Sequence, residues 1–268
     1  MSNPTSGAPI TLPPKALITG ASSGIGHAFA LELARRGFDL TLIARREQKL
    51  KAIIQELSKS DTDQKHRILV ADLSKPASVD QICNDIATAQ YDLVINNAGA
   101  GIYKPFRDAP WEDIEANVQL NCLAVTKLSY QYLKTAKAGD ALINVASIVG
   151  FTPYPPAAVY GATKAFVLSL TEALWQQYRA QDIYVMALCP GATDTEFFET
   201  AGVDPKKRPP RFYRQTSEDV VATALRALKK RHQPTVIPGW HNKIFHLVMR
   251  ILNRRALVRA VGNQSARK

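Results

Sequence analysis

The sequence has few of the features on which secreted and membrane-spanning proteins depend. It holds three cysteines among its 268 residues, Cys83, Cys122 and Cys189, and each lies among apolar neighbours. Scattered thiols of this number cannot build a disulfide framework or a zinc cluster. We therefore expect buried free thiols in a reducing compartment, and hence a cytoplasmic protein. No apolar run approaches the roughly 18 residues that a membrane-spanning helix needs.

The start of the chain lacks the parts of a signal peptide. Residues 1–14 contain four prolines and no charge, with neither a basic start nor a long apolar core. We expect a disordered lead-in over residues 1–14, a folded domain over 15–240 and an extension over 241–268. The five histidines show no ligand spacing with supporting cysteines or acids, so no metal site is predicted.

Acidic residues are scarce in the last quarter of the chain. Residues 205–268 hold 16 Lys and Arg against two acids, Glu218 and Asp219, whereas residues 1–204 hold 18 against 21. The net charge of +11 therefore comes from the C-terminal quarter. Nucleic-acid binding would suit this charge, but no recognised motif accompanies it, so no nucleic-acid partner is predicted.

Short apolar runs alternate with helical patterns along the chain. The predicted strands cover residues 16–19, 40–44, 68–71, 93–95, 141–145, 183–188 and 235–237. The predicted helices cover residues 24–36, 48–58, 79–88, 111–134, 157–179 and 217–230. Buried strands that alternate with helices are typical of a parallel sheet covered on both faces. The sequence predicts one α/β domain with a Rossmann-type, doubly wound parallel sheet.

A glycine-rich turn follows the first predicted strand. It reads Thr19-Gly20-Ala21-Ser22-Ser23-Gly24-Ile25-Gly26. Glycines allow the backbone to turn tightly and to approach a pyrophosphate, while the next helix offers its N-terminal N–H groups to that anion. The position between the first strand and the first helix favours a dinucleotide site over a chance glycine triplet.

Two arginines, Arg45 and Arg46, follow the second predicted strand. Dinucleotide folds that bind NAD carry an acid near this point for the adenine ribose, and here that position falls on Ala44. A guanidinium can pair with a 2′-phosphate, so the pattern favours NADP(H). The alternative is that both arginines belong to a solvated helix start.

Tyr160 and Lys164 lie four residues apart, and Ser147 lies thirteen residues before Tyr160. A phenol ordinarily titrates near ~10, too high for proton transfer at neutral pH. A lysine ammonium one helical turn away would lower that pKa, and a serine hydroxyl would hold a substrate oxygen. Taken alone, the pair is equally compatible with an ordinary surface pair on a helix.

An ordered set of motifs resembles the short-chain dehydrogenase/reductase family over roughly residues 15–240. The set comprises Thr-Gly-x-x-x-Gly-x-Gly at 19–26, Asp72-Leu73, Asn96-Asn97-Ala98-Gly99, Asn121, Ser147, Tyr160-x-x-x-Lys164 and Pro190-Gly191. The resemblance implies an NADP(H)-binding catalytic domain that transfers a hydride between nicotinamide and a carbonyl/alcohol pair.

The same resemblance implies a catalytic set of Asn121, Ser147, Tyr160 and Lys164. Tyr160 would be the general acid or base, Lys164 would lower its pKa and bind the nicotinamide ribose, and Ser147 would bind the substrate oxygen. Asn121 would hold a water that relays protons to Lys164; a helix–helix hydrogen bond is the alternative role for this asparagine.

The resemblance also implies that residues of six segments contact the cofactor. Asp72 and Leu73 would meet the adenine, Asn97, Ala98 and Gly99 would let the cofactor approach the strand end, and residues after the sixth strand would face the nicotinamide. With the turn and the two arginines, the full set is Gly20, Ser22, Ser23, Gly24, Ile25, Gly26, Arg45, Arg46, Asp72, Leu73, Asn97, Ala98, Gly99, Tyr160, Lys164, Pro190, Gly191, Thr193 and Thr195.

Aromatic side chains are concentrated in three segments that we expect to line the substrate pocket. These segments cover residues 101–106, 151–156 and 196–213, and they hold Phe106, Phe151, Tyr154, Phe197, Phe198, Phe212 and Tyr213. This composition favours an apolar or extended carbonyl substrate, unless the aromatics only pack the loops. The basic run 206–208 could attract an anionic substrate instead.

The tail after Gly239 predicts an amphipathic basic helix over residues 243–255, with apolar residues on one side. Three roles are open: packing on the domain or a dimer mate, peripheral contact with a membrane, and a lid on the pocket. The two long helices, 111–134 and 157–179, resemble the dimer-forming helices of the family, which implies a homodimer or homotetramer.

Two rival functions use the same fold. One is a non-catalytic NADP(H)-binding regulator, which the intact set of Ser147, Tyr160 and Lys164 disfavours. The other is a membrane-surface or nucleic-acid binder that relies on the basic tail, and its function would survive the substitution Tyr160→Phe.

Overall fold

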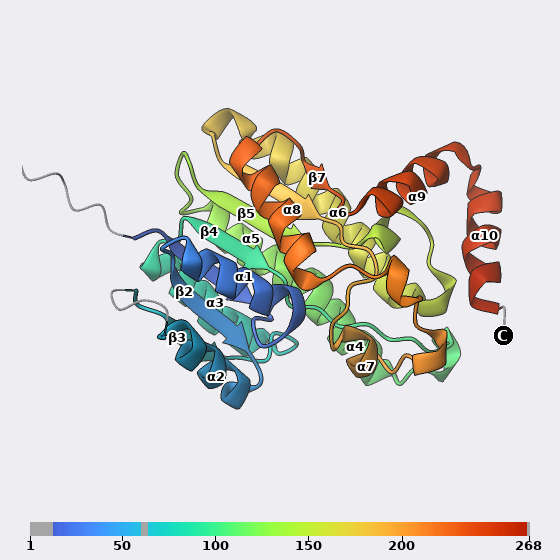
Figure 1. The fold of residues 1–268 in the computed structure, drawn as a ribbon, viewed down its shortest axis with the longest axis horizontal. Helices are drawn as coiled ribbons and strands as arrows, with labels where there is room; N and C mark the ends of the chain where they lie inside the picture. Colours follow the sequence, from blue (N-terminus) through green and yellow to red (C-terminus); the bar gives the residue numbers. More distant parts are fainter. Residues whose placement is uncertain (1–12, 60–63, 267–268) are drawn as a thin grey trace, which may run out of the picture.

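The computed structural model describes residues 13–59 and 64–266, so most of the predicted lead-in, residues 1–12, lies outside the described part. A parallel sheet of seven strands, in the order β3-β2-β1-β4-β5-β6-β7, forms the centre of the molecule (Figure 1). The strands are β1 (Lys15–Thr19), β2 (Asp39–Ala44), β3 (Arg67–Val70), β4 (Leu93–Asn96), β5 (Ala141–Val145), β6 (Tyr184–Leu188) and β7 (Thr235–Val236). The predicted doubly wound α/β fold is confirmed.

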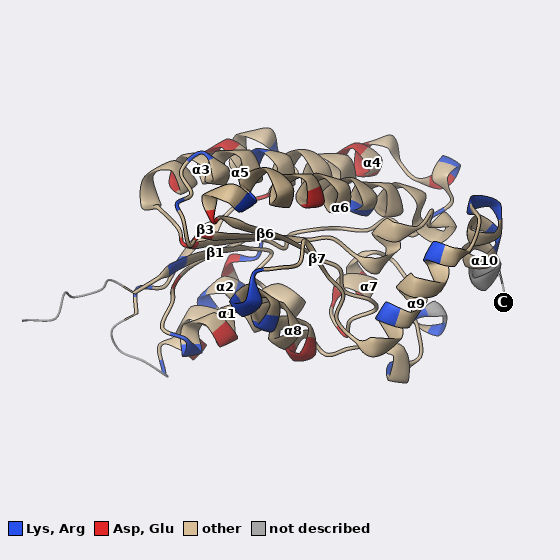
Figure 2. Cartoon of the chain, turned by 90° about the horizontal axis from the view of Figure 1, so that it is seen from above, with Lys and Arg blue, Asp and Glu red and all other residues tan. Residues whose placement is uncertain are grey.

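Helices cover both faces of the sheet, which Figure 2 shows edge-on. One face carries α1 (Gly24–Arg35), α2 (Glu47–Leu57) and α8 (Ser217–Lys230), and the other carries α3 (Pro76–Ala89), α4 (Trp111–Val118), α5 (Val125–Leu133) and α6 (Ala158–Tyr178). All residues of β5 and β6 are buried, as expected of strands between two helical layers. The three cysteines are buried free thiols, as predicted.

The strand order places a crevice at the carboxyl end of β1. The chain begins in the middle of the sheet, adds β2 and β3 on one side, and then crosses to β4 on the other side of β1. Connections from β1 and β4 therefore leave in opposite directions, which opens the place where doubly wound folds bind ligands. The glycine-rich turn and the Asn97 segment both lie at this edge.

The helix predicted over residues 111–134 is interrupted by a π-helical turn, Gln119–Ala124, between α4 and α5. A π-turn inserts one extra residue into the helix and is often found at functional sites. Asn117 and Asn121 face inward here, and the Asn121 amide donates to the Asn117 side-chain oxygen at 3.1 Å. Apolar periodicity does not reveal such a turn, because the helix continues on both sides of it.

The prediction of one tail helix over 243–255 was wrong. The structure has two helices, α9 (Trp240–Ile251) and α10 (Arg254–Ala266), which Figure 1 shows at an angle at one end of the molecule. Leu252 between them is extended, with ψ of 136°. Asn253 begins the second helix, since its side-chain oxygen accepts the Ala256 N–H at 2.9 Å. No helix in the described residues is long and apolar enough to cross a membrane.

Candidate active site

Tyr160, Lys164 and Ser147 come together at the carboxyl end of β5. Ser147 lies two residues after the strand, and α6 carries the other two. All are buried, with exposed fractions of 7% for Tyr160, 5% for Lys164 and 8% for Ser147. A surface pair would be solvated, so this burial excludes the ordinary explanation of the Tyr160/Lys164 spacing.

The Lys164 ammonium lies deep in the site. Its Nζ donates to the Val145 carbonyl at 2.8 Å and lies 5.8 Å from the centroid of the Tyr160 ring. Burial disfavours the charged form and lowers the pKa of Lys164 to about 8. A Cβ on Gly99 would lie 3.3 Å from this Nζ, so the segment after β4 passes close beside the lysine.

The pKa of Tyr160 moves in the opposite direction to the one we expected. Burial raises the pKa of the Tyr160 phenol, and a hydrogen bond with the Ser147 hydroxyl lowers it by a smaller amount. The expected lowering by Lys164 is not found in the chain alone, because the lysine is itself desolvated and is held on the Val145 carbonyl. Ser147 is thus the residue that favours the phenolate.

Asn121 ties α6 to the segment after β4. It is fully buried on the π-turn, and its amide donates to the Ala100 carbonyl at 2.8 Å and to Thr163 Oγ1 at 3.0 Å. Its oxygen accepts the Ala100 N–H at 3.1 Å. The helix–helix hydrogen bond considered above is therefore present, through Thr163 on α6.

The glycine-rich turn is built for close backbone contact. Gly20 and Gly24 have φ of +66° and +56°, which L side chains rarely adopt. A Cβ on Gly26 would lie 2.4 Å from the Gly20 carbonyl oxygen, so no other residue fits there without a shift. Asn97 holds this turn, since its amide donates to the carbonyls of Thr19 (2.9 Å) and Gly20 (3.2 Å).

The remaining predicted cofactor residues lie after other strands of the sheet. Asp72 follows β3 and accepts from the Ser74 hydroxyl at 2.8 Å, and Leu73 beside it is buried. After β6, Gly191 packs so tightly that a Cβ would lie 2.3 Å from the Asn242 side chain of α9. Thr195 touches the glycine-rich turn, because a Cβ on Gly24 would lie 2.7 Å from its methyl group.

Backbone hydrogen bonds join the two ends of the segment that follows β6. Thr193 and Gln215 form an isolated parallel bridge, with Asp194 N–H donating to the Gln215 carbonyl and Gln215 N–H donating to the Ala192 carbonyl, both at 2.9 Å. The residues between them form what we call the substrate segment, 194–214. It contains α7 (Phe197–Thr200) and two short 3₁₀ turns.

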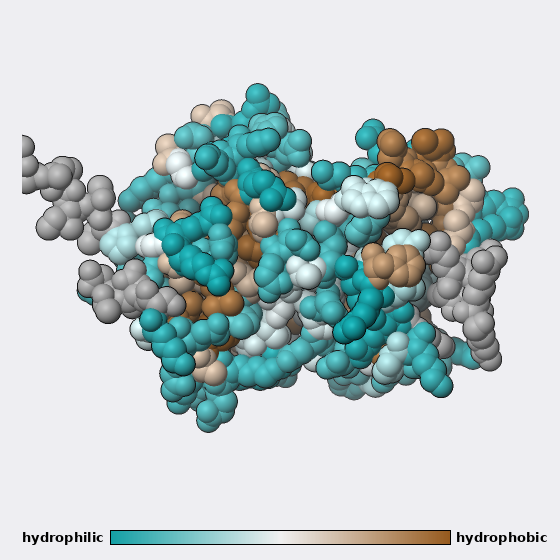
Figure 3. Space-filling view, viewed as in Figure 1, coloured by the Kyte–Doolittle hydropathy of each residue, from teal (hydrophilic) through white to brown (hydrophobic). Residues whose placement is uncertain are grey.

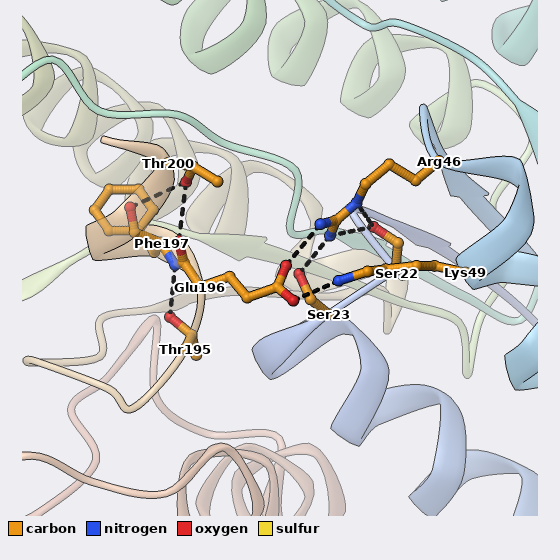
Figure 4. Close-up of polar contacts among 8 residues, drawn as sticks. All are labelled: Ser22, Ser23, Arg46, Lys49, Thr195, Glu196, Phe197 and Thr200. Carbon is orange, nitrogen blue, oxygen red and sulfur yellow. Dashed lines mark hydrogen bonds and ion pairs between the residues drawn. The ribbon is translucent and has the colours of Figure 1, made fainter. Parts of the chain in front are cut away.

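Arg46 lies at the centre of a polar cluster that the sequence only partly predicted (Figure 4). Its Nη2 donates to the hydroxyls of Ser22 and Ser23, both at 2.9 Å, and its Nη1 pairs with Glu196 at 2.6 Å. Lys49 pairs with the other Glu196 oxygen. Arg45, the other arginine that we predicted to bind the cofactor, is exposed. Glu196 and Lys49 were missed, because no local pattern links two residues that far apart in the chain.

Of the predicted aromatics, Phe197 packs on the Tyr160 ring, and a second contact comes from Tyr103, which was not among them. The rings of Phe197 and Tyr103 lie 5.3 Å and 6.2 Å from the Tyr160 ring, centroid to centroid, and Tyr154 packs edge-on against Tyr103. Others do not approach it: Phe151 packs on His246 of α9, and Phe106, Phe212 and Tyr213 are exposed. The surroundings of the Tyr160 ring are therefore aromatic and come from three separate segments. Over the described part of the chain, no cluster of His, Cys, Asp and Glu could hold a metal ion.

Known proteins share this arrangement. The family profile described as short chain dehydrogenase matches residues 14–206. A 7beta-hydroxysteroid dehydrogenase of Mediterraneibacter gnavus is 32% identical over 230 residues, which cover 85% of this chain and 86% of that protein.

Two solved structures have the same architecture. A short-chain dehydrogenase from Sphingobium yanoikuyae in complex with NADPH superposes with a TM-score of 0.78 at 33% identity, covering 90% of this chain and 96% of that one. A bulky-bulky ketone specific alcohol dehydrogenase from Comamonas testosteroni has a TM-score of 0.74 at 28% identity, covering 90% and 95%.

Proposed function

Because the chain belongs to the short-chain dehydrogenase family, and is therefore an oxidoreductase acting on hydroxy or keto groups, we propose that it uses NADP(H) and acts on a bulky, apolar carbonyl/alcohol pair. One observation carries the catalytic part of this proposal: Ser147, Tyr160 and Lys164 are buried together where the sheet opens. Buried polar groups at a strand edge, with strongly shifted pKa values, are typical of an active site.

The chain's own residues suit the proton part of the reaction. In reduction, Tyr160 would donate its phenolic proton to the substrate oxygen, and in oxidation it would take that proton back. The Ser147 hydroxyl would bind the same oxygen and stabilise the phenolate through its hydrogen bond to Tyr160. Lys164 would bind the nicotinamide ribose from its place beside Gly99. The nicotinamide supplies or accepts the hydride.

The glycine-rich turn fits a dinucleotide. Its positive-φ glycines and the crowded contact of Gly26 with Gly20 keep the backbone bare of side chains at the start of α1. The N–H groups at a helix start attract a pyrophosphate. The residues present thus suit the cofactor that the family implies.

The choice of NADP(H) over NAD(H) is supported by charge. Ala44 stands where an acid would bind the ribose hydroxyls, and Arg46 is fixed beside Ser22 and Ser23. A guanidinium held by two hydroxyls is well placed to bind a phosphate, because the side chain has little conformational entropy left to lose when the phosphate binds. The relative from S. yanoikuyae was solved with NADPH.

The substrate class is supported by the walls of the site. The rings of Phe197 and Tyr103 lie beside the Tyr160 ring, and Tyr154 packs on Tyr103, so aromatic surface faces the site. A bulky apolar molecule would bury this surface, whereas a bare sugar would leave its own hydroxyls unpaired. Relatives named for a hydroxysteroid and for bulky ketones act on molecules of this kind.

A homodimer or homotetramer is proposed from the exposed apolar residues on one helical face. Trp111, Leu123 and Tyr130 are 65%, 55% and 64% exposed along α4, the π-turn and α5, and Phe166 on α6 is 43% exposed. Large exposed apolar residues on neighbouring helices are typical of a subunit interface.

We also propose a cytoplasmic protein that touches an anionic membrane through α9. Trp240, Ile244, Leu247 and Ile251 form an exposed apolar stripe, and Figure 3 shows a hydrophobic patch over this helix. Residues 220–266 contain no acid, so two copies would repel each other at this face. Anionic lipid offers the complementary charge.

The enzymatic proposal is tested by following NADPH absorbance with a panel of bulky ketones. Tyr160→Phe should lower kcat by at least about 100-fold, because the phenolic proton is lost while the ring remains. Tyr130→Phe, on the exposed face of α5, is the matched control and should retain full activity. Turnover that is unchanged in Tyr160→Phe would contradict the mechanism and favour a non-catalytic role.

A further inference from the structure

We propose that Glu196 is a cofactor-specificity residue that competes with the 2′-phosphate of NADP(H) for Arg46 and Lys49, so that binding of the phosphate releases α7. The inference deepens the proposed function and depends on it, since it assumes that Arg46 receives the phosphate. It assigns a role to a carboxylate that joins the substrate segment to Arg46 and Lys49 (Figure 4).

Ser22 and Ser23 hold the Arg46 guanidinium in place independently of Glu196. Its Nε and Nη2 donate to Ser22 and Ser23 at 2.9–3.3 Å, which uses one side of the guanidinium and fixes its plane. Only Nη1 is used for the ion pair with Glu196. When the carboxylate leaves, the guanidinium therefore keeps its orientation.

The carboxylate and a phosphate cannot both occupy this place. Glu196 bridges Arg46 and Lys49, one cation on each of its oxygens. A sugar phosphate monoester carries about −1.5 to −2 charges at pH 7 and would repel the carboxylate at this range. NAD(H) has hydroxyls at this position and leaves the ion pairs in place.

The ion pairs of Glu196 form at any working pH, and a phosphate can still displace the carboxylate from them. Cations on both oxygens lower the pKa of Glu196 to about 2, so the carboxylate is ionised at any working pH. Its side chain is 39% exposed and those of Arg46 and Lys49 are 42% and 43% exposed. Exposed ion pairs contribute little net stability, which a doubly charged phosphate can exceed.

Displacement of Glu196 would alter the packing of Phe197 on Tyr160. Glu196 immediately precedes α7, and its backbone carbonyl accepts the Thr200 hydroxyl at 3.1 Å. The next residue, Phe197, packs on the Tyr160 ring. A carboxylate released from Arg46 therefore frees the helix that forms one wall of the active site, and only the phosphorylated cofactor does so.

The test is Glu196→Gln, which removes the charge and keeps the shape. We expect the dissociation constant for NADPH, measured by fluorescence titration without substrate, to fall about two- to fivefold, while that for NADH changes less than twofold. Adenosine 2′,5′-bisphosphate should follow NADPH. Glu199→Gln is the matched control, because Glu199 lies on the same helix and pairs with Arg208 instead. It should change neither constant.

A second measurement follows the helix itself. Hydrogen exchange of residues 197–203 should speed up on adding NADPH but not NADH, and should already be fast in Glu196→Gln. Unchanged or weaker NADPH binding in Glu196→Gln would overturn the inference, as would equal exchange with both cofactors.

Failure of the inference is distinguishable from failure of the proposed function. Arg46→Ala should weaken NADPH binding about tenfold or more if the guanidinium receives the phosphate. Loss of affinity in Arg46→Ala with no gain in Glu196→Gln would reject the competition alone. No effect in Arg46→Ala would reject the assumed phosphate site, and the competition with it.

Discussion

Lys164 is the residue at which burial and charge conflict most. An ammonium removed from water costs free energy, and here it gains one hydrogen bond, to the Val145 carbonyl. The fold therefore favours the neutral amine, which is why the pKa of Lys164 falls to about 8. The site keeps this group at the expense of stability, as functional sites commonly do.

The pH dependence of stability should reveal this cost. Between pH 8 and 10.5 the unfolded chain binds the Lys164 proton while the folded chain does not, so stability rises with pH in that window. Below pH 8 the full cost is present. In the cofactor-free protein, Lys164→Met should be on the order of 1 kcal/mol or more stable than wild type at pH 7.

The advantage of Lys164→Met should shrink between pH 8 and 10.5, measured by denaturant unfolding. Lys134→Met replaces an exposed lysine at the end of α5 and serves as the control, with a pH-independent difference over the same range. A constant advantage for Lys164→Met across the window would show that its ammonium is not buried at a cost.

Single residues also show where sequence reasoning stops. The spacing of Tyr160 and Lys164 predicts that both side chains share a helix face, and the structure places them together. Arg46 was found from its position after β2, but its partner Glu196 was not. A helix repeat or a turn motif is local, whereas this contact depends on how the substrate segment folds back over the sheet edge.

At the level of elements, the glycine-rich turn is the part most constrained by backbone geometry. Gly26 must lack a side chain because the Gly20 carbonyl and the Asn97 amide occupy the space, at 2.4 Å and 2.5 Å from the position that a Cβ would take. Gly37, after α1, has φ of +84° but no atom within 4 Å of such a Cβ. Substitution of Gly26 therefore tests steric crowding, whereas substitution of Gly37 tests only the strain of a positive φ.

Gly26→Ala should therefore weaken NADPH binding about tenfold or more, because the turn must shift away from the pyrophosphate position. Gly37→Ala should cost about 1 kcal/mol of stability and leave the dissociation constant unchanged. Titration and unfolding of both variants check this, and equal losses of NADPH affinity would contradict a role of the turn in cofactor binding.

The elements themselves were largely predictable, and their interruptions were not. Seven apolar runs predicted seven strands, because buried parallel strands need continuous apolar sequence. The π-turn at 119–124 and the break at Leu252 escaped detection. Both features lie within amphipathic sequence, so the spacing of apolar residues does not reveal them. Side-chain hydrogen bonds accompany both, from Asn121 at the π-turn and to Asn253 at the start of α10.

On the scale of the whole molecule, charge and apolar surface coincide at one end. Lys243 and Arg250 on α9 and Arg254 and Arg255 at the start of α10 are exposed, as is the apolar stripe of α9. The residues that were predicted to share one apolar face differ in burial, because Phe245 and Met249 are half-buried while Ile244 and Leu247 remain exposed. A helix that keeps apolar residues on its outer face has surface left to bury.

Leu247→Glu should reduce binding to vesicles of phosphatidylcholine with phosphatidylserine about tenfold, since one inserted leucine contributes roughly 1.5–3 kcal/mol. Added salt should weaken the wild-type interaction, because anionic lipid attracts the basic residues. Val70→Glu, an exposed apolar position on the opposite edge strand, is the control for vesicle flotation. Equal flotation of both variants would reject a membrane contact through α9.

The bridge between Thr193 and Gln215 has a consequence for how such a protein diversifies. It closes the base of the substrate segment, so residues 194–214 can change in sequence or length while the two ends stay hydrogen-bonded to each other. The proposed catalytic residues lie just after β5 (Ser147) and on α6 (Tyr160 and Lys164), outside this closed stretch. The residues that we propose for proton transfer and the stretch that we propose to line the substrate pocket therefore occupy separate parts of the chain, which meet where Phe197 packs on Tyr160. Variation within the stretch would alter substrate choice while the catalytic set is retained.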